Sequence, residues 1–290
     1  MIKMNDKFLK AMFNSSKCPV IDFNLGDMSQ KAQKLTGKLS ISGVQPKLSV
    51  KLDKKQNILI PVAEGGEYIL KPQTSTFPNI PENEQCCIDI AENLNIDIPL
   101  HCLIPLKDNS LAYVVKRFDR EKSIKIHQED FAQILEQTNK YKGSVEQIGR
   151  KLREISSAPG YDVQLFFERV ILNFILGNGD AHLKNYSISF KDKDNIRLTP
   201  AYDIVCSKLV LPDEEDSAIT INGKKNRLKI EDFNKLAKGL NIPLKVRYEK
   251  FENKFDAMKK IIDCSSIAKE KQQQFLEIIE ERLARLKLLK

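Results

Sequence analysis

The segment from residue 176 to residue 190, LGNGDAHLKNYSISF, holds acidic and amide side chains at a spacing that could do chemistry. Asp180 and Asn185 lie five residues apart in a loop that begins with two glycines and runs into an alternating, strand-like stretch. A carboxylate in such a loop can orient a hydroxyl group and accept its proton, and an amide oxygen can bind Mg²⁺ on nucleotide phosphates. These residue types favour phosphoryl transfer, although Gly, Asn and Asp are also the usual residues of simple turns.

A second carboxylate for a metal ion follows in the run LTPAYD, which ends at Asp203. Between the two acids the pattern predicts a β-hairpin, with strands at residues 186–190 and 196–199 and a polar turn at 191–195. Such a hairpin would bring Asp203 back toward Asp180. Protein kinases arrange a catalytic Asp, a metal-binding Asn and a metal-binding Asp in this chain order, which favours catalysis over a plain turn.

Composition limits the class of protein. The chain has 290 residues, 41% of them hydrophobic, which is enough for one large domain or for two lobes around a cleft. No apolar run reaches the roughly 18 residues of a membrane span, and the amino terminus lacks the continuous apolar stretch of a signal peptide. The six cysteines form no CxxC pair, as expected for reduced thiols in the cytoplasm. The net charge of +8 is spread along the chain, so charge alone does not favour DNA binding.

Hydrophobic periodicity predicts a β-rich first part and a helical second part. We expect a hairpin over residues 38–52, a strand at 67–72, a helix at 82–94, and strands at 99–105 and 110–118. Helices are predicted at 129–137, 144–155, 163–176, 230–240, 244–262 and 266–290, and the acidic run 213–216 is predicted to be a solvated loop. The expected fold class is α+β, with a small β-rich lobe in residues 1–118 and a larger, mostly helical lobe in residues 119–290.

Several segments of the β-rich part could handle a nucleotide. The hairpin tip can present backbone amides to phosphates, and Lys71, at a strand end, can pair with the α- and β-phosphates. Glu82 or Glu84 at the start of the next helix could form an ion pair with Lys71. Backbone groups where the last strand ends could meet an adenine. Each signal alone also fits a bare turn, a solvated lysine or a first helical turn, so their order along the chain is the stronger evidence. The tip and strand-end residues are Ser42, Gly43, Val44, Gln45, Lys116, Arg117 and Phe118.

The runs SISGVQPKLSV, ILKP, PENEQ, VVKRFDR, HQEDFAQ, GNGDAHLKN and LTPAYDIV together resemble the HipA-type serine/threonine kinases of bacterial toxin–antitoxin systems. The resemblance covers residue 38 to the end of the chain and implies a two-lobed, protein-kinase-like fold that uses ATP and Mg²⁺. It implies the following roles: Asp180 as catalytic base, Asn185 and Asp203 as magnesium ligands, Lys71 on the ATP phosphates, Arg117 and Phe118 in the adenine hinge, His182 and Lys184 supporting the catalytic loop or the phosphoryl group, and Ser40 and Ser42 as autophosphorylation sites.

Only some forty residues precede the nucleotide loop, so the chain is most similar to the shorter, HipT-type kinases of three-component systems. That resemblance implies that a separate small protein replaces an N-terminal subdomain. It also implies a DNA-binding antitoxin, so that the kinase contacts DNA only indirectly, through the antitoxin. It implies a cytoplasmic toxin that phosphorylates glutamyl- or tryptophanyl-tRNA synthetase, with no membrane partner. The residues leave two alternatives open: a small-molecule or lipid kinase of the same architecture, and a non-catalytic nucleotide- or DNA-associated module.

Overall fold

The structure is a computed structural model, and it describes residues 4–24, 26–27, 46–74, 76–121 and 124–289. The chain divides into two compact units, one made of Met1–Cys86 and Pro99–Ile124 and the other of Cys87–Ile98 and Lys125–Lys290. The boundary passes through helix α3 (Ile80–Asn93). The predicted strand at 39–42 and the nucleotide-loop residues Ser40, Ser42, Gly43, Val44 and Gln45 lie outside the described residues.

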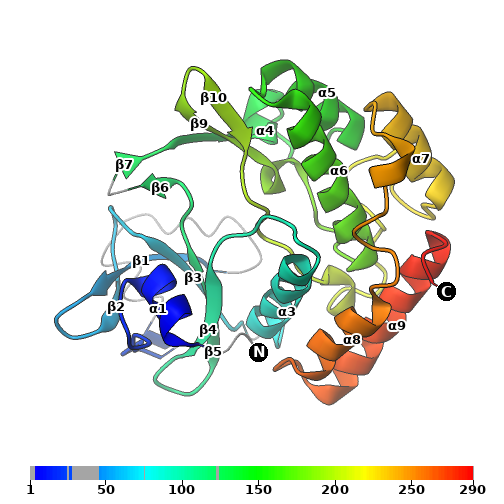
Figure 1. The fold of residues 1–290 in the computed structure, drawn as a ribbon. Helices are drawn as coiled ribbons and strands as arrows, with labels where there is room; N and C mark the ends of the chain where they lie inside the picture. Colours follow the sequence, from blue (N-terminus) through cyan, green and yellow to red (C-terminus); the bar gives the residue numbers. More distant parts are fainter. Residues whose placement is uncertain (1–3, 25, 28–45, 75, 122–123, 290) are drawn as a thin grey trace. The chain divides into compact units, whose positions relative to one another are not determined.

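The first unit is built on a five-stranded antiparallel sheet with the strand order β2-β1-β3-β5-β4 (Figure 1). Its strands are β1 (Leu48–Asp53), β2 (Ile58–Pro61), β3 (Tyr68–Pro72), β4 (His101–Pro105) and β5 (Leu111–Lys116). Four of these correspond to predicted strands, and β1 extends one residue beyond the predicted hairpin. Strand β2 was not predicted, and it pairs with β1 through a short turn in which Asn57 adopts a positive φ of 54°.

Helix α1 (Asp6–Phe13) packs on this sheet. It begins at an N-cap, Asn5, whose side chain accepts a hydrogen bond of 2.9 Å from the backbone of Phe8. Its buried residues join the same hydrophobic cluster as Val50 and Leu70 of the strands. The Tyr68 hydroxyl donates a hydrogen bond of 2.9 Å to the Met12 carbonyl, which ties the helix to β3. Short strands β6 (Arg120–Glu121) and β7 (Ile124–Lys125) follow β5 along the chain.

The second unit is mostly helical and is organised around α6 (Pro159–Ile175), which buries 12 of its 17 residues, both apolar and charged. Helix α5 (Val145–Ile155) packs along it and begins at a capping box formed by Ser144 and Gln147. The other helices of this unit are α4 (Phe131–Ile134), α7 (Ile230–Gly239), α8 (Phe255–Asp263) and α9 (Lys269–Arg285), with 3₁₀ turns at Leu183–Asn185, Ser207–Leu209 and Leu244–Val246. The expected α+β class, β-rich and then helical, is confirmed.

Two predicted helices were wrong in part. Residues 127–130 form strand β8 (His127–Asp130), because Asp130 is an extended N-cap whose carboxylate accepts a hydrogen bond from the Gln133 backbone, and α4 begins only after it. The predicted helix at 244–262 is interrupted between the 3₁₀ turn and α8. Asn253 lies there with a φ of 56°, which an α-helix does not accommodate.

The predicted hairpin after the 177–185 loop is confirmed. Strand β9 (Ser187–Asp192) pairs antiparallel with β10 (Asn195–Leu198), and β8 adds a third strand on the other edge of β9. At the end of the hairpin, the Thr199 backbone donates a hydrogen bond of 3.0 Å to the Ser187 carbonyl. Because of this pairing, the residues after β10 lie next to the start of β9 and so next to the loop that precedes it.

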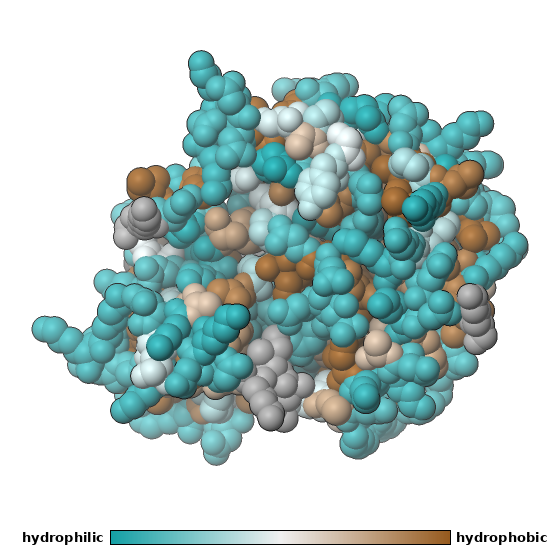
Figure 2. Space-filling model, in the orientation of Figure 1, coloured by the Kyte–Doolittle hydropathy of each residue, from teal (hydrophilic) through white to brown (hydrophobic). Residues whose placement is uncertain are grey.

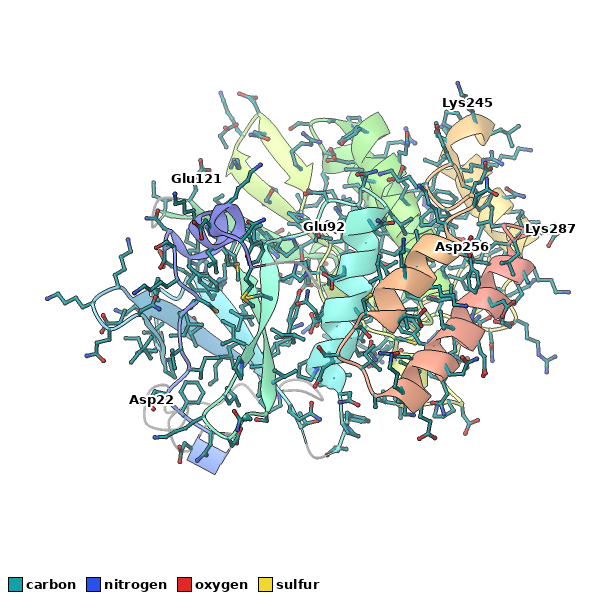
Figure 3. The ribbon with its side chains drawn as sticks, turned by 60° about the horizontal axis from the view of Figure 1, so that its bottom comes forward. Asp22, Glu92, Glu121, Lys245, Asp256 and Lys287 are labelled. Atoms are coloured by element: carbon teal, nitrogen blue, oxygen red, sulfur yellow. The ribbon has the colours of Figure 1, made fainter. Side chains whose placement is uncertain are left out.

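The surface is polar and carries many charged side chains. The face drawn in Figure 2 is mostly hydrophilic, with hydrophobic residues scattered among the polar ones. The six charged side chains labelled in Figure 3 are all exposed and project away from the ribbon. Within the described ranges, no helix combines the length and the apolar character that crossing a bilayer requires.

Candidate active site

Helix α6 ends at the loop that carries Asp180. Gly177 follows the helix with a φ of 67°, and the Asn178 backbone donates a hydrogen bond of 2.8 Å to the Asn173 carbonyl. This left-handed C-terminal turn suits glycine. A Cβ atom at Gly177 would also lie 2.9 Å from a side-chain methyl of Ile278, closer than real Cβ contacts come. The glycine therefore ends α6 and aims the chain into the loop.

Asp180 is hydrogen-bonded by Tyr141, a residue that no sequence pattern singled out. The Tyr141 hydroxyl donates a hydrogen bond of 2.8 Å to Asp180 Oδ1, and the Tyr141 ring meets His182 edge-on, with ring centroids 5.4 Å apart. Burial, together with the hydrogen bond and the charge of Asp180, raises the pKa of Tyr141. The phenol therefore stays protonated at neutral pH and keeps donating to the carboxylate.

The two predicted metal ligands lie against each other. Asn185 Nδ2 donates a hydrogen bond of 3.2 Å to Asp203 Oδ2, and Asn185 Oδ1 accepts one of 2.9 Å from the His182 backbone. Asp203 has a φ of 59°, a conformation that non-glycine residues adopt rarely and that is often found at functional sites. The amide and the carboxylate are therefore fixed side by side, on segments 18 residues apart.

This donor set fits a magnesium ion. Mg²⁺ prefers hard oxygen ligands, and proteins usually supply it with one or two carboxylates while water and substrate phosphates complete the octahedron. Asn185 and Asp203 supply one amide oxygen and one carboxylate. The neighbouring Tyr202 hydroxyl donates a hydrogen bond of 2.8 Å to the Lys184 carbonyl, so the backbone on both sides of the pair is fixed.

His182 and Lys184, the two residues expected to support the loop, differ from each other in burial. His182 is buried, and in the described part of the chain its Nδ1 atom has no hydrogen-bond partner. Burial lowers the pKa of His182, although the charges of Asp180 and Asp203 oppose this effect. The Lys184 side chain is exposed. The imidazole therefore packs within the loop, whereas the lysine reaches solvent.

The acidic run at 213–216 is a loop, as predicted, but only Asp213 and Glu215 are exposed, whereas Glu214 and Asp216 are not. Glu214 is half-buried, and its carboxylate accepts a hydrogen bond from Ser207 Oγ, which itself accepts one of 2.8 Å from the Gly179 backbone. A Cβ atom at Gly179 would lie 2.5 Å from Glu214 Oε2. Burial raises the pKa of Glu214, against the lowering effect of its Ser207 hydrogen bond. This segment therefore braces the loop next to Asp180.

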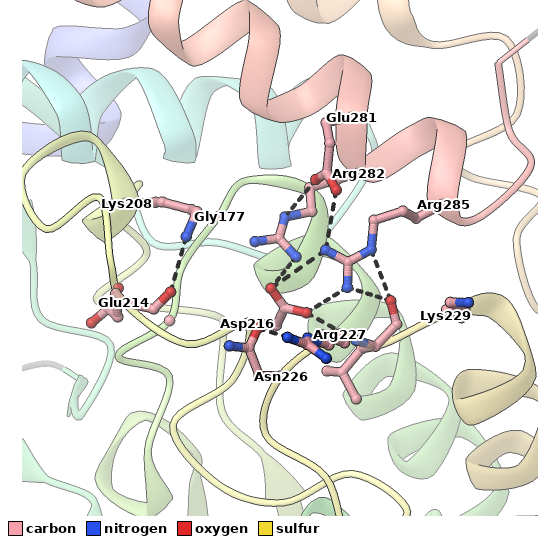
Figure 4. Close-up of polar contacts among 12 residues, drawn as sticks. Gly177, Lys208, Glu214, Asp216, Asn226, Arg227, Lys229, Glu281, Arg282 and Arg285 are labelled. Carbon is pink, nitrogen blue, oxygen red and sulfur yellow. Dashed lines mark hydrogen bonds and ion pairs between the residues drawn. The ribbon is translucent and has the colours of Figure 1, made fainter.

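Asp216 anchors the same segment to α9 (Figure 4). It is buried and forms ion pairs with Arg282 and Arg285, the latter through an Nη2–Oδ2 distance of 2.5 Å. The Leu228 backbone donates a further hydrogen bond of 2.9 Å to Asp216 Oδ2. Burial alone would raise the pKa of Asp216, but hydrogen bonds from the two arginines and the backbone outweigh it and lower the pKa.

In the first unit, Lys71 forms the predicted ion pair, and its partner is Glu84 rather than Glu82. The Nζ–Oε1 distance is 2.5 Å, and both residues are almost completely buried. The Lys71 ammonium also lies 5.6 Å from the centre of the Tyr113 ring. A buried, oriented lysine of this kind is unlike a solvated strand-end lysine.

Arg117, one of the predicted hinge residues, takes part in a network of ion pairs with two neighbouring residues. Arg117 makes a bidentate ion pair with Asp119, at 2.8 and 2.7 Å, and Arg120 adds a third bond of 2.6 Å. Lys116 instead donates a hydrogen bond of 2.6 Å to the Ala11 carbonyl of α1. The side chains of Lys116 and Arg117 therefore have structural partners, and their backbone N–H groups donate to the Leu100 and Glu67 carbonyls at 2.8 and 2.9 Å.

Residues 39–284 match the family model described as HipA-like C-terminal domain. The chain belongs to this HipA-like family.

Relatives and solved structures agree with the family. The chain is 35% identical over 206 residues to the Sinorhizobium fredii protein named "Putative kinase Y4dM", covering 65% of this chain and 50% of that protein. It is 33% identical over 189 residues to a Haemophilus influenzae protein named "Putative kinase", covering 60% and 54%. The chain thus spans about half the length of these relatives.

Two structures share the fold. HipA from Shewanella oneidensis, solved in a toxin–antitoxin complex with HipB and operator DNA, matches with a TM-score of 0.70 at 20% identity, over 86% of this chain and 65% of that one. The Helicobacter pylori proinflammatory kinase CtkA matches with a TM-score of 0.58 at 16% identity, over 92% and 95%. The HipA-like fold expected from the sequence is therefore confirmed.

Proposed function

We propose that this HipA-like chain is a serine/threonine protein kinase that uses ATP and Mg²⁺, with Asp180, Asn185 and Asp203 as its central residues. The observation that carries the proposal is the hydrogen bond between Asn185 and Asp203. It places the amide of the loop that holds Asp180 against the carboxylate of Asp203, which follows the β9–β10 hairpin and has a φ of 59°. The names of the two relatives and of CtkA point to the same activity class.

In the proposed reaction, the acceptor hydroxyl oxygen forms a bond to the γ-phosphorus of ATP while the bond to the bridging oxygen of ADP breaks. Asp180 orients the hydroxyl and takes its proton. Tyr141 occupies Oδ1 of that carboxylate, so Oδ2 is the oxygen that accepts the proton. A magnesium ion bound by Asn185 and Asp203 would offset the charge of the phosphates. Lys71, oriented by Glu84, would bind the α- and β-phosphate oxygens.

We further propose that the kinase is the toxin of a HipT-like, three-component toxin–antitoxin system in the cytoplasm. Its acceptor would be a serine of tryptophanyl- or glutamyl-tRNA synthetase, and it would autophosphorylate on Ser40 and Ser42. The family and the motifs of the nucleotide loop support these assignments. The Shewanella HipA structure, which contains HipB and operator DNA, supports a DNA-binding antitoxin as the partner of this chain.

The test is phosphoryl transfer from radiolabelled ATP with Mg²⁺, using phosphatase-treated protein and mass spectrometry of the product. Asp180→Asn should lower the rate by about 10²- to 10⁴-fold, the usual contribution of a general base. Asp194→Asn, which removes an exposed carboxylate from the β9–β10 turn, is the matched control and should leave the rate unchanged. Equal rates in wild type and Asp180→Asn would refute the mechanism.

The same protein separates the two alternatives. Transfer to small alcohols or lipids, with none to synthetases or to the loop serines, would identify a small-molecule kinase of this architecture. Absence of any transfer, together with DNA binding by this chain alone that falls steeply with salt, would identify a DNA-associated module.

A further inference from the structure

Arg169 lies in the middle of α6 and is only 3% exposed. Within the described part of the chain, no hydrogen bond or ion pair reaches its guanidinium, and Nε and Nη2 are buried without a partner. Burial lowers the pKa of Arg169 to about 10, against the opposing charge of Asp97, so the side chain keeps its charge at neutral pH. It is a buried cation that the described protein does not neutralise by contact.

Such an arginine is costly for folding. A buried charge without hydrogen bonds or a counter-ion destabilises the native state, so buried arginines are normally paired. Arg282 shows the usual arrangement, since it is 2% exposed, is paired with Asp216 and lies 4.7 Å from the centre of the Phe174 ring. Two arginines of the same unit are therefore equally buried but differ in whether protein groups neutralise them.

The position of Arg169 indicates what could neutralise it. It lines a small pocket of the helical unit together with Asn185 and Asp203, the proposed magnesium ligands, and with Tyr202. The polar lining also includes Tyr186 and two amides, Asn173 of α6 and Asn178 just after it, which are hydrogen-bonded to each other at 2.9 Å. An anion in this pocket would lie among residues that include Arg169 and the proposed magnesium ligands.

We propose that Arg169 is an anion-binding residue whose guanidinium donates hydrogen bonds to a phosphate oxygen in this pocket. The planar guanidinium suits phosphate because it can offer two parallel N–H groups. The phosphate belongs either to the bound nucleotide, in which case the inference rests on the proposed kinase function, or to free inorganic phosphate. In both cases Arg169 lowers the stability of the unliganded protein, and the bound phosphate neutralises its charge.

The first experiment compares thermal unfolding of the full-length wild type with Arg169→Met and Arg282→Met, without ligand. Methionine has a similar length and no charge. Arg169→Met should melt at the same temperature as wild type or higher, because it removes an unpaired buried charge. Arg282→Met should melt lower, because it removes one of the two arginines that neutralise the buried Asp216. If Arg169→Met melts as far below wild type as Arg282→Met does, Arg169 has a structural role and the proposal is overturned.

The second experiment titrates wild type and Arg169→Met with adenosine, ADP, the non-hydrolysable analogue AMP-PNP with Mg²⁺, and inorganic phosphate, by calorimetry. A charge-assisted hydrogen bond is typically worth about a 10- to 100-fold change in affinity. We expect AMP-PNP to bind that much more weakly to Arg169→Met, while adenosine binding is unchanged. Loss of inorganic phosphate binding alone would assign the pocket to free phosphate.

Two results would overturn the inference in this second experiment. One is equal affinity of both proteins for all four probes, and the other is failure of wild type to bind any phosphate-bearing probe. Neither result depends on turnover. If wild type transfers no phosphoryl group but Arg169→Met still loses phosphate affinity, the anion site stands and the kinase proposal fails.

Discussion

Removing Glu84 should destabilise the β-rich unit, because it leaves the Lys71 ammonium buried and unpaired. At the observed 2.5 Å, and with an effective dielectric constant of about 20, the attraction between the two charges is about 7 kcal/mol. Desolvation of two buried ions offsets much of this gain, so the intact pair contributes little net stability. Loss of one partner alone should cost about 3–5 kcal/mol. We therefore expect Glu84→Leu to lower the free energy of unfolding by that amount.

The double variant Lys71→Met/Glu84→Leu removes both charges and should recover most of the loss, since apolar replacements of buried ion pairs are often neutral. It should nevertheless transfer no phosphoryl group. Urea denaturation, with hydrogen exchange of peptides from β3 and α3 to localise the effect, measures both stabilities. The control is Glu154→Gln, which breaks an exposed Lys151–Glu154 pair of 3.0 Å and should cost less than about 1 kcal/mol. A loss below about 1 kcal/mol for Glu84→Leu, or no recovery in the double variant, would refute the reasoning.

Gly177→Ala should lower the melting temperature and cost more than Gly223→Ala, because both glycines have positive φ but only Gly177 lacks room for a Cβ beside Ile278. The left-handed backbone costs about 1 kcal/mol in each, so equal losses measured by denaturant unfolding would contradict the steric argument. Asp216 has a lowered folded-state pKa, so its contribution to stability is present above the unfolded pKa of about 4 and is lost as pH falls through the folded pKa. Asp216→Asn should therefore flatten the acid side of the stability–pH curve, whereas Asp213→Asn, at an exposed site, should not.

Local sequence was enough to predict the loop, the hairpin and the helix that precedes them. Gly177 and the polar run after it mark a helix end, and the alternation after Asn185 indicates a strand, because these signals depend on backbone preferences within a few residues. The hairpin then places Asp203 near Asn185 by chain geometry alone. The proximity of Asn185 and Asp203, the proposed metal ligands, could therefore be predicted without knowledge of any distant contact.

The partners of the site could not be predicted, because each comes from a segment that only tertiary packing brings close. Tyr141 reaches Asp180 across 39 residues, and Arg282 reaches Asp216 across 66. Periodicity shows which face of a helix is buried, but it does not show which buried polar group meets which other one. For the same reason, the sequence could not show that Asp216, in an acidic run that is otherwise partly exposed, is a buried anchor.

The sequence by itself determined the residue types that can move a proton and bind a metal, and the order in which the chain presents them. Tertiary structure alone decided that Glu84 rather than Glu82 pairs with Lys71, and that Arg169 is buried without a partner in the described part of the chain. The physical reason is that desolvation and ion pairing depend on how completely neighbouring elements exclude water from a side chain. That exclusion is set by the packing of segments far apart in the chain.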